Sequence, residues 1–156
     1  MANIDASIQK AQEILQTARN VVALTGAGIS TPSGIPDFRS PTSGLWDDHD
    51  PMEVATIGAF QRQPELFYEW MRPLADKLLQ AKPNPAHYAL RDLEERGPLL
   101  SIITQNIDML HTRAGSQKVY EVHGHLREAT CLSCGSVTAA VDKLTEFVET
   151  GEIPHC

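Results

Sequence analysis

A glycine-rich turn lies near the start of the chain, directly after a short apolar run. It reads Thr25-Gly26-Ala27-Gly28-Ile29-Ser30. Glycine in such a turn lets the backbone approach a pyrophosphate, and the N–H groups of a following helix would bind the phosphates. The match to the dinucleotide fingerprint G-x-G-x-x-G is partial, because Thr31 stands at the third glycine position. Taken alone, the turn is also typical of strand-to-helix connections in folds that bind nothing.

Three cysteines near the end of the sequence have a spacing that suits a metal. Cys131 and Cys134 form a C-x-x-C pair, whose thiolates can bind one tetrahedral zinc ion. Cys156 follows at close to the usual spacing of a four-cysteine ribbon, and water or His155 could take the fourth place. A redox or incidental pair is the alternative for a lone C-x-x-C.

Further polar side chains follow two other apolar runs. Asn106 and Asp108 come after one run, and His123 comes after the next. The carboxyl ends of parallel strands gather ligands, and an imidazole with a pKa of about 6.5 suits a general base. Asn and Asp are also turn formers, and a lone His more often makes a structural hydrogen bond, so these simpler interpretations stay open.

Short apolar runs predict the strands that must position these residues. Each run is rich in Val, Ile or Leu and bounded by turn residues, as buried parallel strands are. The expected strands are residues 21–24, 99–103 and 119–122. The Gly-, Pro- and Ser-rich residues 26–46 predict a long loop.

Helical patterns connect the strands. An amphipathic helix is expected over residues 5–19, with Asp5 as N-cap and Ile8 and Leu15 on its apolar face. Another is expected near residues 141–149.

Prolines punctuate the helical region in the middle of the chain. A helical pattern over residues 51–81 is expected to break before Pro64 and before Pro73, because proline ends or kinks a helix. Asn84 and Gly97 predict the N-cap and the C′ position of the next helix.

The alternation of helices and strands predicts an α/β fold. We expect a partial Rossmann-like parallel sheet with helices, plus a helical insertion and an incomplete zinc-ribbon module. Residues 1–125 would form the nucleotide-binding domain, with the insertion at about residues 44–97. Residues 126–156 would form the first part of a small zinc-binding module. Three strands correspond to about one mononucleotide half of a doubly wound sheet.

The composition excludes several classes of protein. The 156 residues carry a formal net charge of −7, which disfavours direct binding of nucleic acid, because that needs clustered Lys and Arg. No apolar run approaches the ~20 residues that span a bilayer, so no membrane partner is expected. The start does not read as a signal peptide, and a cytoplasmic location is expected.

Longer runs around the turn and the polar residues identify a family. Residues 26–39 read Gly-Ala-Gly-Ile-Ser-Thr-Pro-Ser-Gly-Ile-Pro-Asp-Phe-Arg, and Gly44-Leu45-Trp46 follows. Residues 104–108 read Thr-Gln-Asn-Ile-Asp, and residues 121–124 read Glu-Val-His-Gly. In this order the runs resemble the signatures of the sirtuin family, over essentially the whole chain.

The resemblance implies an NAD-dependent protein-lysine deacetylase or deacylase. Such an enzyme transfers the acyl group of acetyl-lysine, in a protein or peptide partner, to the ADP-ribose of NAD and releases nicotinamide. His123 is the implied general base toward a ribose hydroxyl, and Asn106 is the second implied catalytic residue. The resemblance gives His125 no catalytic role, and His111 is expected to support the second signature. Histidines outside any motif are expected at the surface or in helices: His49, His87 and His155.

The same resemblance implies the residues that bind NAD. Backbone groups of Ala27 and Gly28 would meet the phosphates, and Gln105 would bind the nicotinamide ribose. Asp108 and the backbone near Ile35 would recognise the carboxamide. The full implied set is Gly26, Ala27, Gly28, Ser30, Ile35, Asp37, Phe38, Arg39, Gln105, Asn106, Ile107, Asp108 and His123.

Two members of this set have more specific implied roles. Phe38 would cover the reaction centre and obstruct nicotinamide from re-attacking, and it could also anchor the long loop. Arg39 would offer its planar fork of donors to an NAD phosphate or ribose.

The acyl preference follows from one further comparison with the family. Some sirtuins that remove negatively charged acyl groups place a Tyr and an Arg three residues apart on a helix. The equivalent positions here hold Met71 and Leu74, which could not compensate the desolvation of a carboxylate. Acetyl or longer aliphatic groups are therefore expected, although Arg72 lies close by.

Other family features are missing from the 156 residues. Sirtuins continue with a fourth cysteine, a loop that pairs with the substrate backbone and a turn for the adenosine half of NAD. We therefore expect an N-terminal part of a bacterial- or archaeal-type sirtuin, with Cys131, Cys134 and Cys156 as zinc ligands. It should be marginally stable, with impaired or no activity alone. The alternatives are a non-catalytic interaction module that retains the NAD loop and, more weakly, a Rossmann oxidoreductase.

Overall fold

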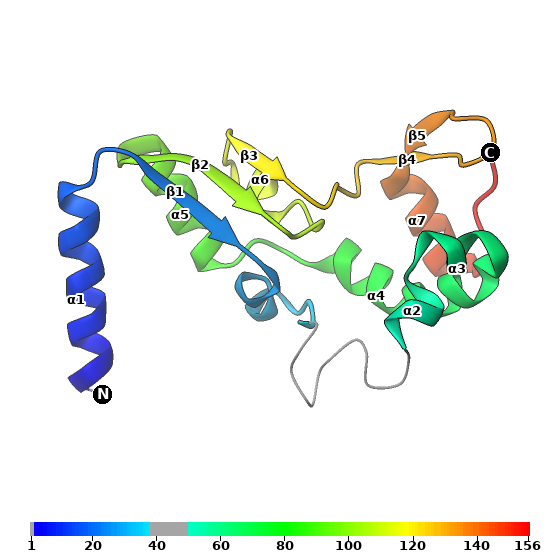
Figure 1. Cartoon of the computed structure of the whole chain (residues 1–156), viewed down its shortest axis with the longest axis horizontal. Coiled ribbons are helices and arrows are strands. Elements are labelled where there is room, and N and C mark those ends of the chain that lie inside the picture. The colour runs from blue at the N-terminus through cyan, green and yellow to red at the C-terminus, as the bar shows by residue number, and fades with distance from the viewer. Residues whose placement is uncertain (1, 38–49) are drawn as a thin grey trace.

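A three-stranded parallel sheet forms the middle of the computed structural model, which describes residues 2–37 and 50–156 (Figure 1). The strand order is β1 (Val21–Thr25), β2 (Leu99–Thr104) and β3 (Val119–Glu121). Both pairings are parallel, as the apolar runs predict, and each strand end lies within one residue of its expected position. The expected α/β fold is confirmed.

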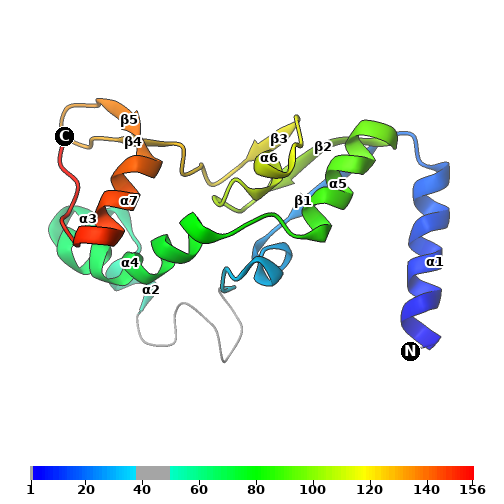
Figure 2. The same ribbon diagram turned by 180° about the vertical axis from the view of Figure 1, so that it is seen from behind.

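Helices cover one face of this sheet. α5 (Pro85–Arg96) packs against β2, and α6 (Leu110–Ala114) packs against α5 (Figure 2). The pairing register places Ala23, Ile102 and Val119 in one row, where Ile102 is fully buried. The next row contains Leu24 and Tyr120, which are 70% and 60% exposed. The strands are expected to be buried on both faces of the sheet. This expectation is wrong for the face that carries Leu24 and Tyr120, because no described element packs against it.

The sequence around α5 explains why this helix begins and ends where it does. The side chain of Asn84 accepts from the backbone N–H of Ala86, and the ring of His87 completes a capping box. Gly97 closes the helix, as predicted, but it does so as the C-cap residue and in an extended conformation with φ −123°. Glycine is needed there for close approach, because a Cβ would lie 2.9 Å from the carbonyl oxygen of Leu93.

The first helix extends away from the sheet (Figure 1). α1 spans Ala2–Thr17, so Asp5 lies in its first turn and the expected N-cap at this residue is wrong. The apolar residues Ile4, Ile8 and Ile14 are more than half exposed. The amphipathic pattern thus predicts the helix correctly, but the described residues do not cover its apolar face.

Three further helices lie beyond the glycine-rich region: α2 (Pro51–Val54), α3 (Ile57–Arg62) and α4 (Pro64–Gln80). The predicted break before Pro64 is confirmed. The predicted break before Pro73 is wrong, because α4 runs through this residue. Burial of Met71, Leu74 and Leu78 in one apolar cluster stabilises the helix on both sides of the proline.

A small hairpin and a helix complete the chain. β4 (Glu128–Thr130) pairs antiparallel with β5 (Val137–Ala139), and α7 (Ala140–Thr150) packs against α4. These elements lie at the opposite end of the molecule from α1 (Figures 1 and 2). In the described part of the chain, no helix has the length and apolar character needed to cross a membrane.

Candidate active site

The carboxyl ends of the three strands of the parallel sheet meet at one edge. The N–H of Gln105 donates to the carbonyl of Thr25 at 3.0 Å, and the N–H of Val122 donates to the carbonyl of Thr104 at 3.0 Å. The segments that follow the strands therefore begin side by side. This is the edge at which open α/β sheets bind ligands.

The glycine-rich turn forms two short 3-10 turns, η1 (Ala27–Ile29) and η2 (Thr31–Ser33), in part of the region expected to be an irregular loop. A Cβ added to Gly26 or Gly28 would meet no atom within 4 Å. Neither glycine has a positive φ, so the fold itself requires glycine at neither position. Open space beside an accessible backbone is what the close approach of a phosphate needs, and the turn fits a nucleotide in this respect.

Three polar side chains from the turn and from the end of β2 form one hydrogen-bond network. The hydroxyl of Ser30 donates to Oδ2 of Asp108 at 2.6 Å. The amide of Asn106 donates to Oγ of Ser30 at 3.0 Å and to the carbonyl of Gly26 at 3.1 Å. Ser30 and Asp108 are buried, and Asn106 is half-buried. Both amide hydrogens of Asn106 are thereby used, and its carbonyl oxygen is the remaining polar group of the side chain.

The carboxylate of Asp108 also holds the backbone that follows it. Its Oδ1 accepts from the N–H of Leu110 at 2.9 Å, in an Asx-type turn. Met109 between them is left-handed, with φ 61°, which is uncommon for a residue other than glycine. This conformation is unfavourable for methionine and persists where the surrounding structure fixes it, as the bonds of Asp108 to Ser30 and to Leu110 do here.

His123 lies at the same edge, just beyond β3. Its Nδ1 is 3.1 Å from the carbonyl oxygen of Gln105, and the ring is exposed. A carbonyl can only accept, so Nδ1 carries the hydrogen and Nε2 of the neutral ring is left as an acceptor. An exposed imidazole with a fixed tautomer and an accepting Nε2 has the form of a general base.

Two buried histidines lie beneath this edge. The rings of His87 and His111 are 4.8 Å apart, and Nε2 of His111 lies 2.9 Å from Oγ1 of Thr25. Burial lowers the pKa of His87, and burial together with the neighbouring His87 ring lowers the pKa of His111 to about 4. Both rings are therefore neutral near pH 7. Of the two places expected for His87, the surface or a helix, the structure shows the helix: the residue lies in α5, and its side chain is fully buried.

The remaining predicted residues are placed as follows. Ile35 is buried in the apolar cluster with Met71 and Leu74, while Asp37 and Ile107 are half-buried. Some predicted positions lie outside the described residues: Phe38, Arg39 and Gly44 to Trp46.

Sequence reasoning missed one residue that contacts the turn. The amide of Asn84 donates to the carbonyl of Ile29 at 2.7 Å and to Oγ of Ser33 at 2.9 Å. The Asn-Pro signal predicts its capping role, but nothing local to residue 84 indicates a contact 55 positions away.

The three cysteines come together at the other end of the molecule. Their Sγ atoms lie within 4.8 Å of one another, and those of Cys134 and Cys156 are 4.0 Å apart. Four thiolates around zinc at about 2.3 Å lie about 3.8 Å from each other, so this donor set fits one face of a tetrahedral site. A hydrogen bond from Ser136 and the neighbouring thiols lower the pKa of Cys134 to about 7, which favours the thiolate that zinc requires.

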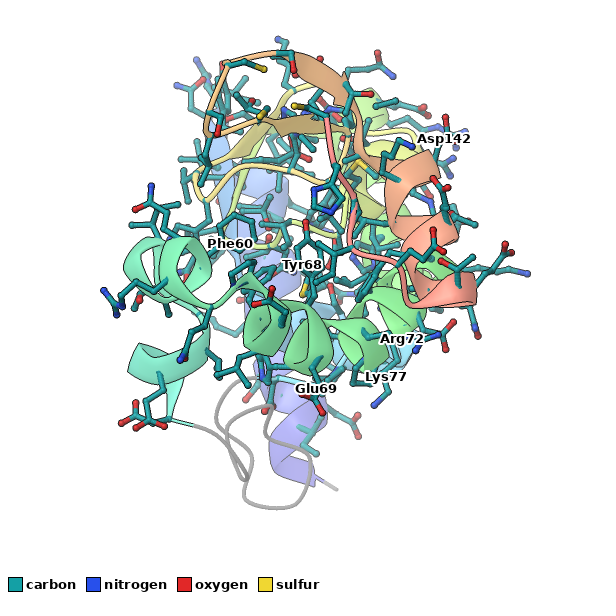
Figure 3. The ribbon with its side chains drawn as sticks, turned by 90° about the vertical axis from the view of Figure 1, so that its right-hand side faces the viewer. Phe60, Tyr68, Glu69, Arg72, Lys77 and Asp142 are labelled. Carbon is teal, nitrogen blue, oxygen red and sulfur yellow. The ribbon has the colours of Figure 1, made fainter. Side chains whose placement is uncertain are left out.

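A large cavity lies beside these cysteines and away from the Ser30–Asp108 network. It has a volume of about 930 Å³, and Phe60, Tyr68, Leu144 and Ile153 contribute to its lining. Figure 3 shows this end of the molecule. Phe60 and Tyr68 lie on the side of α3 and α4 that is turned toward the hairpin of β4 and β5. The edge of the sheet is a more suitable centre for chemistry than this mainly apolar hollow, because the network supplies a carboxylate and an amide there and His123 supplies an imidazole at the same edge.

Comparisons with known proteins agree on one family. The model of the Sir2 family matches residues 26–156. NAD-dependent protein deacetylase 2 of Caldanaerobacter subterraneus subsp. tengcongensis is 48% identical over 146 residues, which cover 94% of this chain and 58% of that protein. NAD-dependent protein deacylase 2 of Archaeoglobus fulgidus is 48% identical over 153 residues, which cover 98% of this chain and 59% of that protein. The chain thus spans somewhat less than two thirds of the length of these curated relatives.

Solved structures give the same result. One described as the structural basis for the mechanism and regulation of Sir2 enzymes matches with a TM-score of 0.86 at 48% identity, covering 96% of this chain and 58% of that chain. A Sir2 complex with a p53 peptide and NAD+ matches with a TM-score of 0.78 at 43% identity, covering 96% of this chain and 58% of that chain.

Proposed function

Because this chain belongs to the Sir2 family, as its signatures indicate, we propose that it carries the catalytic centre of an NAD-dependent protein-lysine deacetylase. The observation that supports this most is the convergence of Ser30, Asn106, Asp108 and His123 at one edge of a parallel sheet. When bound there, NAD would supply the ribose carbon that accepts the acyl group and would lose nicotinamide.

The side chains at this edge suit distinct tasks. Nε2 of His123 is the acceptor for a ribose hydroxyl proton, since Nδ1 donates to the carbonyl of Gln105. The turn would bind the phosphates through the backbone of Ala27 and Gly28. Asn106 would orient the ribose and nicotinamide through its carbonyl oxygen, while Asp108 and the backbone of Ile35 would receive the carboxamide.

Acetyl-lysine is the proposed acyl substrate. Met71 and Leu74 are apolar and buried, and an apolar environment does not compensate the desolvation of a carboxylate. The guanidinium of Arg72 donates from Nε and Nη2 to the carbonyl of Val148 at 3.2 and 2.8 Å. This contact directs Arg72 toward α7, which supports acetyl over succinyl.

We also propose that zinc binds Cys131, Cys134 and Cys156 within a small module formed by residues 126–156. The role of the metal would be structural, because the cysteine cluster lies away from the Ser30–Asp108 network and His123, where the proposed chemistry takes place. The ion would fix the hairpin of β4 and β5 to the segment that ends at Cys156.

We expect the 156 residues alone to have low deacetylase activity. The exposed row that includes Leu24 and Tyr120 gives the sheet a solvated apolar face, which disfavours a stably formed site. The same face supports a second candidate function, a non-catalytic interaction module that retains the turn. The two functions differ in whether nicotinamide is released.

Nicotinamide release from NAD in the presence of an acetyl-lysine peptide tests the proposal. The chain should release nicotinamide only with the peptide, and His123→Ala should reduce the rate by a factor of about 100 or more. His125→Ala is the matched control, because this second histidine lies two residues away, and it should change the rate little. NAD binding without release would favour the interaction module. Release that persists in His123→Ala would overturn the proposed role of this residue.

A further inference from the structure

Asn84 connects the start of α5 to the glycine-rich turn through a single side chain. Its Nδ2 donates to the carbonyl of Ile29 at 2.7 Å and to Oγ of Ser33 at 2.9 Å. Its Oδ1 accepts from the N–H of Ala86 at 2.9 Å. The residue is 8% exposed, so water competes little for these bonds. One planar amide thus bonds to a helix end on one side and to the turn on the other.

This connection is the second of two anchors on the turn. The first is Ser30, which bonds to Asn106 and Asp108 after β2. Ile29 and Ser33 lie on either side of Ser30 in the sequence, and both are held by Asn84. The turn is therefore fixed from the strand end and from the helix start at once.

Few residue types can make both contacts. The carbonyl of Ile29 only accepts, so its partner must donate, whereas the start of a helix needs an acceptor. Asp, Ser and Thr cap helices as well as Asn does or nearly so. Asp has no donor for Ile29 when ionised, and Ser is too short to keep the donor at the same place. Capping alone thus does not account for the asparagine.

We propose that Asn84 is a positioning residue for the turn, holding Ile29 and Ser33 so that the backbone of Ala27 and Gly28 is preformed for a dinucleotide phosphate. The assignment of the phosphate rests on the proposed function, whereas the effect of Asn84 on the turn does not. Losing both bonds is expected to loosen the turn by about tenfold, since one neutral hydrogen bond typically contributes a factor of about two to ten.

Amide hydrogen exchange of the ligand-free chain tests the effect on the turn. The reporters are the N–H groups of Ser30, Ser33 and Gly34, which bond to carbonyls within the turn. Asn84→Ser keeps a capping hydroxyl and removes the contacts to the turn, so these amides should exchange about tenfold faster while α5 stays protected. Asn84→Ala removes the cap as well and should also expose the first turn of α5.

Two further variants make the result specific. Ser33→Ala removes one acceptor from the turn without touching α5, and it should accelerate the same amides by a smaller factor. Gln80→Ala removes an amide that donates to Asp76 on the surface of α4, and it should leave the turn unchanged. Unchanged exchange in Asn84→Ser, or equal acceleration throughout α5, would overturn the proposal.

Calorimetric titration with NAD then separates the two hypotheses. If the unaltered chain binds NAD, Asn84→Ser should bind it about tenfold more weakly, because the turn must be ordered on binding. Equal affinity of the two proteins would overturn the role of Asn84 in binding. If the unaltered chain does not bind NAD, the proposed function fails, and hydrogen exchange still decides whether Asn84 holds the turn.

Discussion

The hydroxyl of Ser30 lies 2.6 Å from Oδ2 of Asp108, and both side chains are almost completely buried. The two residues are 78 positions apart, one in the turn after β1 and the other after β2. Their bond therefore joins two neighbouring strand ends at the edge where the candidate active site lies. Because a carboxylate accepts strongly and little water reaches it, this bond contributes more than an exposed one would.

Ser30→Ala should destabilise the chain. The substitution leaves Oδ2 of Asp108 buried without its donor, and an unsatisfied buried polar group typically costs about 1–3 kcal/mol. The free energy of unfolding, measured by urea titration, should fall by this amount. Ser101→Ala, at a half-buried serine in β2, is the control and should cost less. Equal effects of the two substitutions would show that the bond contributes nothing specific.

The buried His111 predicts how stability depends on pH. Its pKa is lowered to about 4, mainly by burial and by His87, although Asp108 and Glu121 act in the opposite direction. The unfolded chain has a histidine pKa near 6.5, so between pH 6.5 and about 4 the unfolded state binds more protons than the folded state. Stability contributed by the neutral ring is thus complete above pH 6.5 and is lost as the pH falls toward 4.

The melting temperature should record this loss. It should decrease steadily from pH 6.5 to about 4, corresponding to roughly 3 kcal/mol from His111. His111→Gln should be less stable at pH 7 but should show a shallower decrease, because one lowered pKa has been removed. His155→Gln is the control, since this histidine is exposed. The same slope in His111→Gln as in the unaltered chain would refute the assignment.

The fold could be predicted largely from local patterns. The three apolar runs and the Asn-Pro start of α5 predict elements whose observed ends differ by about a residue, because each depends on neighbouring residues. Pro73 shows where local rules fail. The burial of Met71 and Leu74 on either side of it stabilises a continuous α4 that proline by itself would interrupt.

The candidate site was predictable only in part. The signatures indicate Ser30, Asn106, Asp108 and His123 as site residues, and the structure brings these four to one edge of the sheet. Their bonds to one another depend on the pairing of distant strands, which no local pattern reports. Asn84 could not be found for the same reason, since its contacts with the turn arise from the packing of α5 against the sheet.

Removal of zinc should loosen the hairpin end of the molecule. Adding one equivalent of zinc to the metal-free chain should raise the melting temperature by roughly 5–10 °C, because a ligand that binds only the folded state stabilises it. Affinity should fall as the pH decreases, because protons compete for the thiols, and the neighbouring cysteines raise the pKa of Cys156. Cys134→Ser should lose most of the zinc measured by mass spectrometry, and Ser133→Ala should keep it. Full zinc content in Cys134→Ser would exclude the three-cysteine site.

Arg72 connects α4 to the end of α7. Two of its nitrogens donate to the carbonyl of Val148, and the guanidinium lies 6.0 Å from the centre of the Phe147 ring. Gly151 ends α7 with φ 79°, and a Cβ there would lie 3.0 Å from Nη1 of Arg72. Glycine at position 151 therefore allows both the left-handed backbone and the close approach of Arg72.

Arg72→Ala should lower the free energy of unfolding by about 1–3 kcal/mol, through the loss of the contacts with Val148 and Phe147. Arg72→Lys should recover little of this, because an ammonium cannot reproduce two donors in a fixed plane. Arg19→Ala, at an exposed position, is the control for loss of charge. Since Arg72 is held by α7, neither substitution should change the ratio of acetyl to succinyl peptide turnover. A lower succinyl rate in Arg72→Ala, with acetyl turnover unchanged, would show instead that this arginine reaches the acyl group.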